Sequence, residues 1–256
     1  MEIRAGLTIA ADGRHSTLRA AAGFSVDDLG APMDVLWFKL AVRPGENAAV
    51  FGRIGDRALL VRLYRGDYWQ CALVIRKGGF EAVQHEGLPA FRARVAALAR
   101  RDNADEIRSW DDVRLLTVAV DRLLRWHAPG LLFIGDAAHA MSPIGGVGIN
   151  LAIQDAVAAA NILFAPLSRG AVSAADLSAV QKRRWFPTWA TQTVQVLIQN
   201  RVIDPILKGE AKPIVPTLVK LAHRWTWLQR FPARLIGIGV RPEHVSPALL
   251  NAGRNV

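Results

Sequence analysis

The sequence predicts a mixed α/β (α+β) fold, and three observations support this prediction. An uncharged apolar run over 131–134 passes through a Gly-Asp turn and a glycine-rich loop into Ala- and Leu-rich sequence. β-Branched, aromatic and aliphatic residues dominate several segments between residues 35 and 76, as is typical of strands. After Leu163 the chain reads as helical, with prolines between the helical segments. We therefore expect an α/β segment, an antiparallel sheet and a helical carboxyl-terminal region.

Composition indicates a globular protein without a polyanionic partner. The chain has 256 residues, 51% of them hydrophobic, which is ample for a core. The formal net charge is +10, but the basic residues are scattered and never form a run of five. This pattern favours a solvated basic surface over nucleic-acid binding.

The cellular location is predicted from what the sequence lacks. The single Cys71 excludes an internal disulfide framework and is typical of a reducing compartment, so we expect a cytoplasmic protein. The first residues lack the apolar core of a signal peptide. No uninterrupted apolar run reaches about 18 residues, so no membrane span is expected.

The amino-terminal segment predicts a strand followed by a capped helix. Residues 3–10 form the strand, which ends at Asp12-Gly13. Ser16 is a good N-cap for a helix that runs to Ala22, where Gly23 ends it. On its own this is an ordinary turn and helix.

The next hundred residues predict the antiparallel sheet. Strand-like segments occupy 35–42, 58–64 and 68–75, separated by turn-like sequence. An amphipathic helix is expected over 89–101 and a further strand over 113–120. Five aromatic residues of this region either line a pocket or belong to the core: Trp37, Phe38, Tyr64, Tyr68 and Trp69.

The stretch from Leu131 to Leu163 predicts a cofactor site. Gly135 and Asp136 place one carboxylate just beyond the carboxyl end of a buried strand. The glycines of the following loop allow bare backbone to approach a ligand. Asn150 then leads into a helix whose amino terminus attracts negative charge. His139, a lone histidine beside small residues, is a general acid or, more simply, a structural residue.

The carboxyl-terminal region predicts three helices, over 174–189, 193–207 and 214–229. Their tryptophans and arginines suggest an amphipathic surface that covers the cofactor domain, or that touches a membrane or a partner subunit. The residues concerned are Trp185, Trp189, Trp225, Trp227, Arg183, Arg184, Arg224 and Arg230. The six histidines and one cysteine show no zinc-ligand spacing, so no metal is expected.

Two motifs resemble those of the FAD-dependent aromatic hydroxylase-type (class A) flavoprotein monooxygenases. Residues 12–19, Asp-Gly-Arg-His-Ser-Thr-Leu-Arg, resemble the DG motif of that family. Residues 135–139, Gly-Asp-Ala-Ala-His, with the glycine loop and Asp155-Ala156, resemble its GD motif. The resemblance covers most of residues 1–165.

The resemblance implies the cofactor, the reaction and the site residues. FAD is the cofactor, NADH or NADPH the electron donor, and molecular oxygen and a small aromatic or other hydrophobic compound the substrates. The flavin performs the chemistry, so no catalytic side chain is assigned. The cofactor-binding residues implied are Asp12, Gly13, Arg19, Gly135, Asp136, Pro143, Gly145, Gly146, Val147, Gly148, Ile149 and Asn150.

The resemblance also implies the domain boundaries. Residues 1–30 and 126–165 correspond to parts of a Rossmann-like FAD-binding domain. Residues 31–125 correspond to the substrate-domain sheet, and residues 166–256 form the carboxyl-terminal helical region.

One departure from the family pattern leaves alternatives open. The GxGxxG loop that holds the adenosine half of FAD has no counterpart, so we expect an amino-terminally shortened monooxygenase that binds FAD weakly by itself. Its sheet would have an exposed edge prone to self-association. The alternatives are a reductase or dehydrogenase of the same fold, and a non-catalytic remnant that binds a ligand or partner chain.

Overall fold

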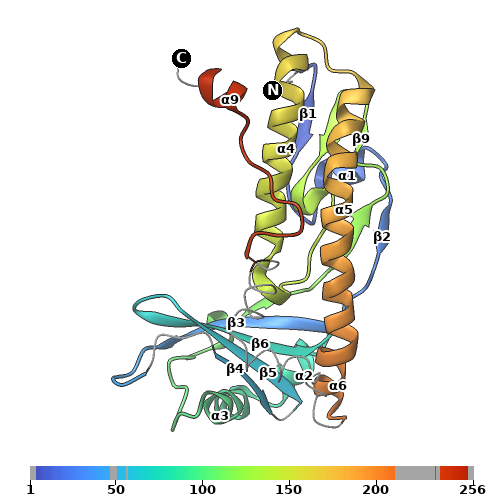
Figure 1. Cartoon of the computed structure of the whole chain (residues 1–256). Coiled ribbons are helices and arrows are strands. Elements are labelled where there is room, and N and C mark those ends of the chain that lie inside the picture. Colours follow the sequence, from blue (N-terminus) through green and yellow to red (C-terminus); the bar gives the residue numbers. More distant parts are fainter. Residues whose placement is uncertain (1–3, 47–50, 56, 211–233, 235–236, 253–256) are drawn as a thin grey trace. The chain divides into compact units, whose positions relative to one another are not determined.

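The computed structural model describes residues 4–46, 51–55, 57–210, 234 and 237–252 (Figure 1). The chain divides into two compact units. The first unit comprises residues 1–30, 119–196 and 215–256, and the second comprises residues 31–118 and 197–214. Residues 119–125 therefore belong with the motif-bearing segments and not with the inserted sheet.

The strands and helices are as follows. The strands are β1 (Thr8–Ala10), β2 (Val26–Asp28), β3 (Met33–Ala41), β4 (Phe51–Gly55), β5 (Ala58–Tyr64), β6 (Tyr68–Arg76), β7 (Arg114–Leu116), β8 (Asp121–Leu123), β9 (His127–Ala128) and β10 (Leu131–Phe133). The α-helices are α1 (Thr17–Ala21), α2 (Phe80–His85), α3 (Leu88–Ala99), α4 (Gly148–Ser168), α5 (Ala174–Ile198), α6 (Asp204–Lys208) and α9 (Pro247–Ala252). Short 3₁₀ turns cover Trp110–Asp112, Gly135–Ala137 and Ile144–Gly146, and a π-helical segment covers Gln199–Ile203.

The sheet of the first unit brings its two motifs together. Strands β1 and β10 are parallel and neighbouring, with Ala10 opposite Phe133. Because each strand leads directly into one motif, both motifs leave the sheet at the same end. The strand predicted over 3–10 is shorter than expected, because β10 offers partners only to residues 8–10. Strand β9 pairs antiparallel with β10, and β2 pairs antiparallel with β8.

Helices α4 and α5 pack on this sheet through two apolar clusters. One cluster joins Leu132 of β10 and Ile134, which follows the strand, to Ala159 and Leu163 of α4 and to Leu177 and Val180 of α5. The other surrounds Trp126 and Phe133 and includes the partly buried Trp185. The break predicted between the helices over 174–189 and 193–207 is wrong, since α5 continues to Ile198. Its buried face, at 177, 180, 184, 188, 192 and 195, runs past the proline, and this packing keeps the helix continuous.

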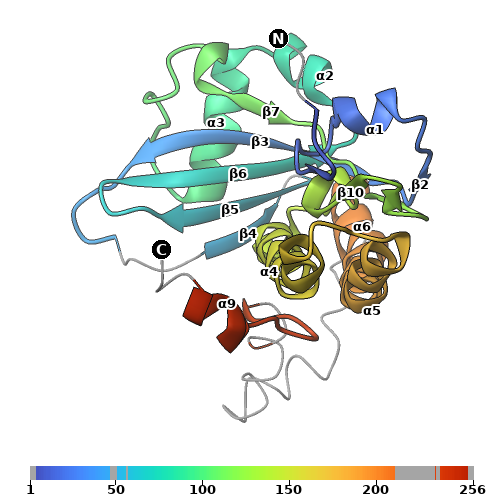
Figure 2. The same cartoon turned by 90° about the horizontal axis from the view of Figure 1, so that it is seen from above.

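The second unit confirms the predicted antiparallel sheet. Its five strands lie in the order β4-β5-β6-β3-β7, side by side in Figure 2. Alternate residues such as Leu36, Phe38 and Trp69 enter one core with Phe91 and Val95 of α3. The predicted strand over 113–120 is confined to Arg114–Leu116, and β4 and α2 were not predicted. Phe38 and Trp69 are core residues, as the simpler interpretation expected.

The predicted amphipathic surface is only partly described. Trp189 is exposed and stacks on exposed Phe186, whereas Arg184 is fully buried. Outside the described residues lie the helix predicted over 214–229 and four of the residues predicted for this surface: Trp225, Trp227, Arg224 and Arg230. By length and composition one described helical stretch, Ile144–Ser168, could cross a membrane. Here its α4 portion packs against the sheet of the first unit.

Candidate functional site

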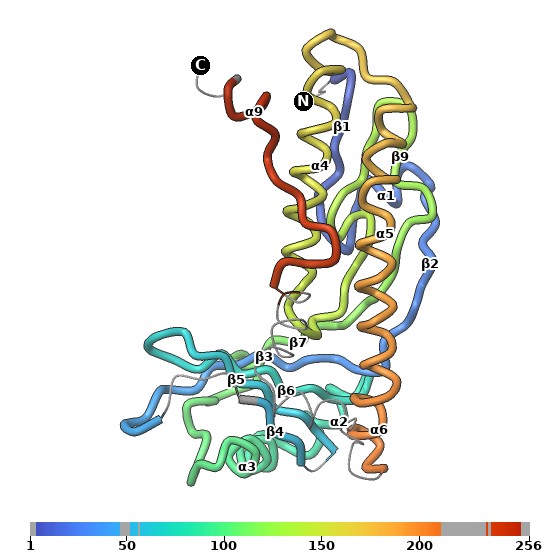
Figure 3. Tube along the Cα trace, viewed as in Figure 1, coloured from blue at the N-terminus to red at the C-terminus, as the bar shows by residue number. Residues whose placement is uncertain are grey.

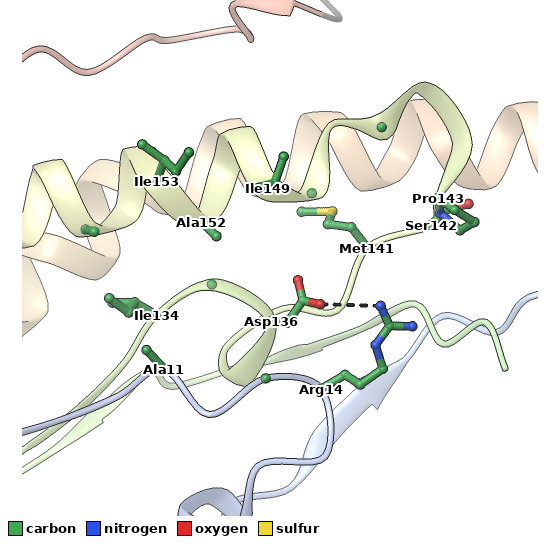
Figure 4. Close-up of a pocket in the computed structure, with 15 residues that line it drawn as sticks. Ala11, Arg14, Ile134, Asp136, Met141, Ser142, Pro143, Ile149, Ala152 and Ile153 are labelled. Carbon is green, nitrogen blue, oxygen red and sulfur yellow. Dashed lines mark ion pairs between the residues drawn. The ribbon is translucent and has the colours of Figure 1, made fainter. Parts of the chain in front are cut away.

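A cleft of about 660 Å³ lies in the first unit, where the two motifs meet (Figure 4). Its walls come from the loop after β1, the turn after β10, the glycine turn and the first turns of α4. Its volume falls within the range of small-molecule and cofactor sites. The lining residues are Ala11, Gly13, Arg14, Ile134, Gly135, Asp136, Met141, Ser142, Pro143, Gly146, Gly148, Ile149, Ala152, Ile153 and Ala156.

The loop after β1 contributes Gly13 and Arg14 to the cleft. Arg14 Nη2 lies 3.6 Å from Asp136 Oδ2, so this loop reaches the turn after β10. Arg19 supports it from behind, because its Nη2 donates to the Arg14 carbonyl at 2.8 Å and its Nη1 to Asp121 Oδ1 at 3.2 Å. Asp12 instead faces α1, where its Oδ2 accepts from the Leu18 amide at 3.2 Å. Hydrogen bonds from Ser16, Leu18 and Thr17 lower the pKa of Asp12.

The turn after β10 presents Asp136. Gly135 adopts φ +58°, and a Cβ at this position would lie 3.0 Å from Ala152 Cβ of α4. Only glycine therefore suits the conformation and the close approach of the helix. Asp136, in the next position, keeps 30% of its side chain exposed and points into the cleft beneath α4 (Figure 4).

The glycine turn leads into the amino terminus of α4. Gly145 and Gly146 both have positive φ, and Gly148 begins the helix without a side-chain cap. The first amides of a helix have no partners within the helix, so these groups are available to a ligand. Ile149 and Ile153 add an exposed apolar edge, being 69% and 56% exposed. The site thus combines free amides, partial positive charge and apolar surface.

Two glutamines of α5 hold the loop that joins the two turns. Gln195 Nε2 donates to the carbonyls of Ser142 and Ile144, both at 2.9 Å, and its Oε1 accepts from the Ser142 amide at 3.2 Å. Gln192 Nε2 donates to the carbonyls of Asp121 and Ala140. Both side chains are buried, so the loop is held in place by two buried side-chain amides.

A fully buried cluster of Asp155, His139 and Arg184 lies next to the turn after β10. Asp155 Oδ2 accepts from the Gly135 amide at 3.0 Å and from His139 Nε2 at 2.5 Å, and Oδ1 accepts from Arg184 Nε at 2.9 Å. Burial by itself would raise the pKa of Asp155, but His139 and Arg184 lower it overall. His139 is buried against Trp126 and does not line the cleft, so the structure assigns it a structural position.

Seven of the twelve predicted cofactor-binding residues line the cleft: Gly13, Gly135, Asp136, Pro143, Gly146, Gly148 and Ile149. The others lie close by. Gly145 shapes the turn, Val147 packs on Met141 and Leu151, and Asn150 Nδ2 donates to the Gly237 carbonyl at 3.3 Å. Asp12 and Arg19 support the first loop.

Several residues that build or support the cleft were not predicted. Arg14 lies inside the motif quoted for the first loop, and its charge opposite Asp136 could have suggested a pairing. The roles of Gln192, Gln195 and Arg184 depend on contacts with residues far away in the sequence, which no local pattern reveals.

The second unit has a separate depression of about 440 Å³ beside the aromatic residues of its sheet. Trp37, Phe38 and Tyr68 line it, but so do charged side chains. These are Lys39, Glu106, Asp111, Asp112 and Arg114. The mixed lining does not identify a pocket for an apolar ring.

Comparisons with known proteins identify the family of the chain. A family model described as FAD binding domain matches residues 1–194. 6-Methylpretetramide 4-monooxygenase of Streptomyces rimosus is 38% identical over 205 residues, which cover 78% of this chain and 49% of the relative. Kynurenine 3-monooxygenase of Stenotrophomonas maltophilia is 31% identical over 249 residues, which cover 88% of this chain and 52% of the relative. The chain thus spans about half the length of these curated relatives.

Solved structures share the fold. PqsL of Pseudomonas aeruginosa, a probable FAD-dependent monooxygenase, has a TM-score of 0.65 at 21% identity, covering 81% of this chain and 59% of that protein. The anhydrotetracycline hydroxylase OxyS of Streptomyces rimosus has a TM-score of 0.63 at 21% identity, covering 92% of this chain and 47% of that protein. These likenesses confirm the predicted fold class. Because the family model matches 194 of 256 residues and includes both motifs, the chain belongs to the FAD-binding domain family of the class A flavoprotein monooxygenases.

Proposed function

We propose that this chain functions in an FAD- and NAD(P)H-dependent monooxygenase that hydroxylates an aromatic or other hydrophobic small molecule. The observation that carries the proposal is the shared cleft. Gly13 and Arg14 of one motif and Gly135, Asp136 and the glycine turn of the other line a single cavity.

The residues of the cleft fit the ring and ribitol half of FAD. Asp136 offers a partly exposed carboxylate to a hydroxyl group, and Arg14 Nη1 is buried with no hydrogen-bond partner in the described part of the chain. The uncapped start of α4 offers amides to a carbonyl oxygen. Ile149 and Ile153 offer apolar contact to a flat ring. A sugar alcohol attached to a polar-edged aromatic ring matches this set of donors and acceptors.

The chain would position and polarise the cofactor. When bound, FAD would supply hydride acceptance from NADH or NADPH and the transfer of one oxygen atom from molecular oxygen to the substrate. The amino terminus of α4 carries roughly half a positive charge, which would stabilise negative charge on the reduced ring. Asp136 would fix the ribitol chain, and the apolar edge at Ile149 and Ile153 would limit access of water.

The substrate class is supported by the names of the relatives. The two described above are monooxygenases of 6-methylpretetramide and of kynurenine. A cytoplasmic location is part of the proposal and is supported by the free, buried Cys71. Self-association stays a prediction.

A second candidate function is a reaction without oxygen transfer. Dialkyldecalin synthase of Streptomyces rugosporus is 29% identical over 155 residues, and the Diels-Alderase PyrE3 has a TM-score of 0.62. Under this candidate the cleft would hold flavin, but no oxygen would be consumed.

The test is a titration of the full chain with FAD, followed by assays with NADH and NADPH. We expect weak, saturable binding seen as a perturbed visible flavin spectrum, then oxygen consumption that increases with a suitable aromatic compound. Asp136→Asn should weaken binding, whereas Asp176→Asn, at the exposed start of α5, should not. Absence of saturable flavin binding contradicts the proposal, and flavin binding without oxygen uptake favours the second candidate.

A further inference from the structure

The buried carboxylate of Asp155 accepts hydrogen bonds from both ends of the turn that presents Asp136. Asp155 Oδ2 accepts from the backbone amide of Gly135, just before Asp136, and from the imidazole of His139, three residues after it. The turn is closed by hydrogen bonds from the amides of Ala138 and His139 to the Gly135 carbonyl, both at 2.9 Å. Asp155 lies on α4, so these hydrogen bonds connect the turn to the helix that forms the opposite wall of the cleft.

Arg184 holds the carboxylate from the other side. Its Nε donates to Asp155 Oδ1, its Nη2 to Gln154 Oε1 at 3.2 Å, and its Nη1 to the carbonyl of Arg241 at 3.1 Å. Arg184 and Asp155 are both 0% exposed. Such a pair is expensive to desolvate and is a poor source of stability compared with apolar packing. A role in fixing geometry would account for its presence.

The Asp155–Arg184 pair also connects the turn to the carboxyl-terminal segment, residues 237–246. This segment runs along α4 (Figure 3) and is bound mainly through its backbone. Gln154 Nε2 donates to the Ile238 carbonyl at 2.8 Å, and Asn161 Nδ2 to the His244 carbonyl at 2.8 Å. Glu243 pairs with Arg183 at 2.6 Å and lies 3.6 Å from Arg184. The turn and α5 therefore contact the Asp155 carboxylate directly. The carboxyl-terminal segment is joined to it only through Arg184.

We propose that Asp155 is a positioning residue that sets the orientation of the Asp136 carboxylate in the cleft, with Arg184 holding Asp155 in place. The inference rests on the proposed function where it concerns flavin, but the orientation of Asp136 is a property of the chain itself. Asp155 does not line the cleft, so any effect on a ligand must pass through the turn.

A purely structural role makes a different prediction from a positioning role. If Asp155 only stabilises the fold, its loss and the loss of Asp136 act independently on flavin affinity. If Asp155 acts through Asp136, its replacement removes nothing further once Asp136 has been replaced. A double-mutant cycle separates the two cases, because only interacting residues give non-additive effects.

The experiment measures riboflavin binding to the full chain by fluorescence quenching. We expect Asp136→Asn and Asp155→Asn each to raise the Kd about tenfold, and the double variant to match Asp136→Asn within about twofold. Leu163→Ala, a buried change two turns along α4, is the control and should lower the melting temperature without changing the Kd. The proposal would be overturned if the Kd of the double variant rose by the product of the two single increases. It would also be overturned by an unchanged Kd in Asp155→Asn.

A readout without flavin separates failure of this inference from failure of the proposed function. NMR should show the backbone amide and the side-chain carboxyl carbon of Asp136, neither of which contacts Asp155 directly, shifted in Asp155→Asn and unchanged in Leu163→Ala. If wild type binds no riboflavin but these signals shift, the positioning role stands and the flavin function fails. If the signals stay in place, the positioning role is wrong. Should Asp155→Asn not fold, Arg184→Lys retains the buried charge, and we expect the same two signals to move by a smaller amount.

Discussion

Arg14 and Asp136 face each other across the cleft with 3.6 Å between the guanidinium and carboxylate groups. One residue follows β1 and the other follows β10, so the parallel pairing of these strands brings them together. The contact shows that the two motifs form one site.

The partly exposed Arg14–Asp136 pair and the buried Arg184–Asp155 pair should differ in their contribution to stability. Arg14 keeps 24% of its side chain exposed, whereas Arg184 is 0% exposed. Arg14→Gln should change the free energy of unfolding by less than about 1 kcal/mol. Arg184→Gln should lower it by about 3–5 kcal/mol, because it leaves Asp155 buried without its cation. Urea denaturation measures both, and equal effects would contradict the assigned burial.

Alanine at Gly135 should be more damaging than alanine at another glycine with positive φ. Gly170 has φ +75°, and a methyl group added there would meet no atom within 4 Å, so Gly170→Ala should lower the free energy of unfolding by about 1–2 kcal/mol from backbone strain alone. Gly135→Ala adds a contact of 3.0 Å with Ala152 and should cost about 1–3 kcal/mol more. Thermal unfolding of the two variants gives the difference, and its absence would argue against the close approach of α4.

The second unit should lose stability in acid through Glu46. Burial would raise the pKa of this carboxyl, but bonds from the Arg43 amide, Trp69 and Arg101 lower it from 4.5 to about 2. A lowered pKa in the folded state contributes stability above pH 4.5, and that contribution is lost as the pH falls from 4.5 to 2. Glu46→Gln should reduce the loss of unfolding free energy between pH 4.5 and 2. Unfolding is monitored by tryptophan fluorescence. Exposed Glu86→Gln is the control, and an unchanged slope in Glu46→Gln would refute the prediction.

Gln195 should control the mobility of the loop between the two turns. Gln195→Leu leaves the Ser142 amide and the carbonyls of Ser142 and Ile144 without this partner, at about 1–3 kcal/mol for each buried group. Amide hydrogen exchange at Ser142 should then be at least about tenfold faster. Thr193→Ala on the exposed face of α5 should leave the exchange unchanged. Equal exchange in both variants would mean that the loop is held by other contacts.

Most of the cleft could be predicted from sequence, because all of its lining except Ala11, Gly13 and Arg14 lies within residues 134–156. Strand, acidic turn, glycine turn and helix follow one another within about thirty residues, and each has its own signature. The Ser16 cap was predictable for the same reason, and its Oγ accepts from the Arg19 amide at 2.9 Å. The sheet of the second unit followed from strand-like composition in β3, β5 and β6.

What could not be predicted depends on partners distant in the sequence. Strand β4 contains two glycines in five residues and is a strand because β5 pairs with it. Helix α5 continues past Pro187 because its buried face is held on both sides of that residue. Asp155 could have been read as a residue bonded to nearby backbone, whereas it joins Gly135, His139 and Arg184.

The most direct measurement is the affinity of the full chain for riboflavin, which carries the ring and ribitol but no nucleotide. We predict one saturable site per chain, with an affinity close to that for FAD and reduced about tenfold in Asp136→Asn. If riboflavin does not bind, or if wild type and Asp136→Asn bind it equally well, the cleft is not a flavin site.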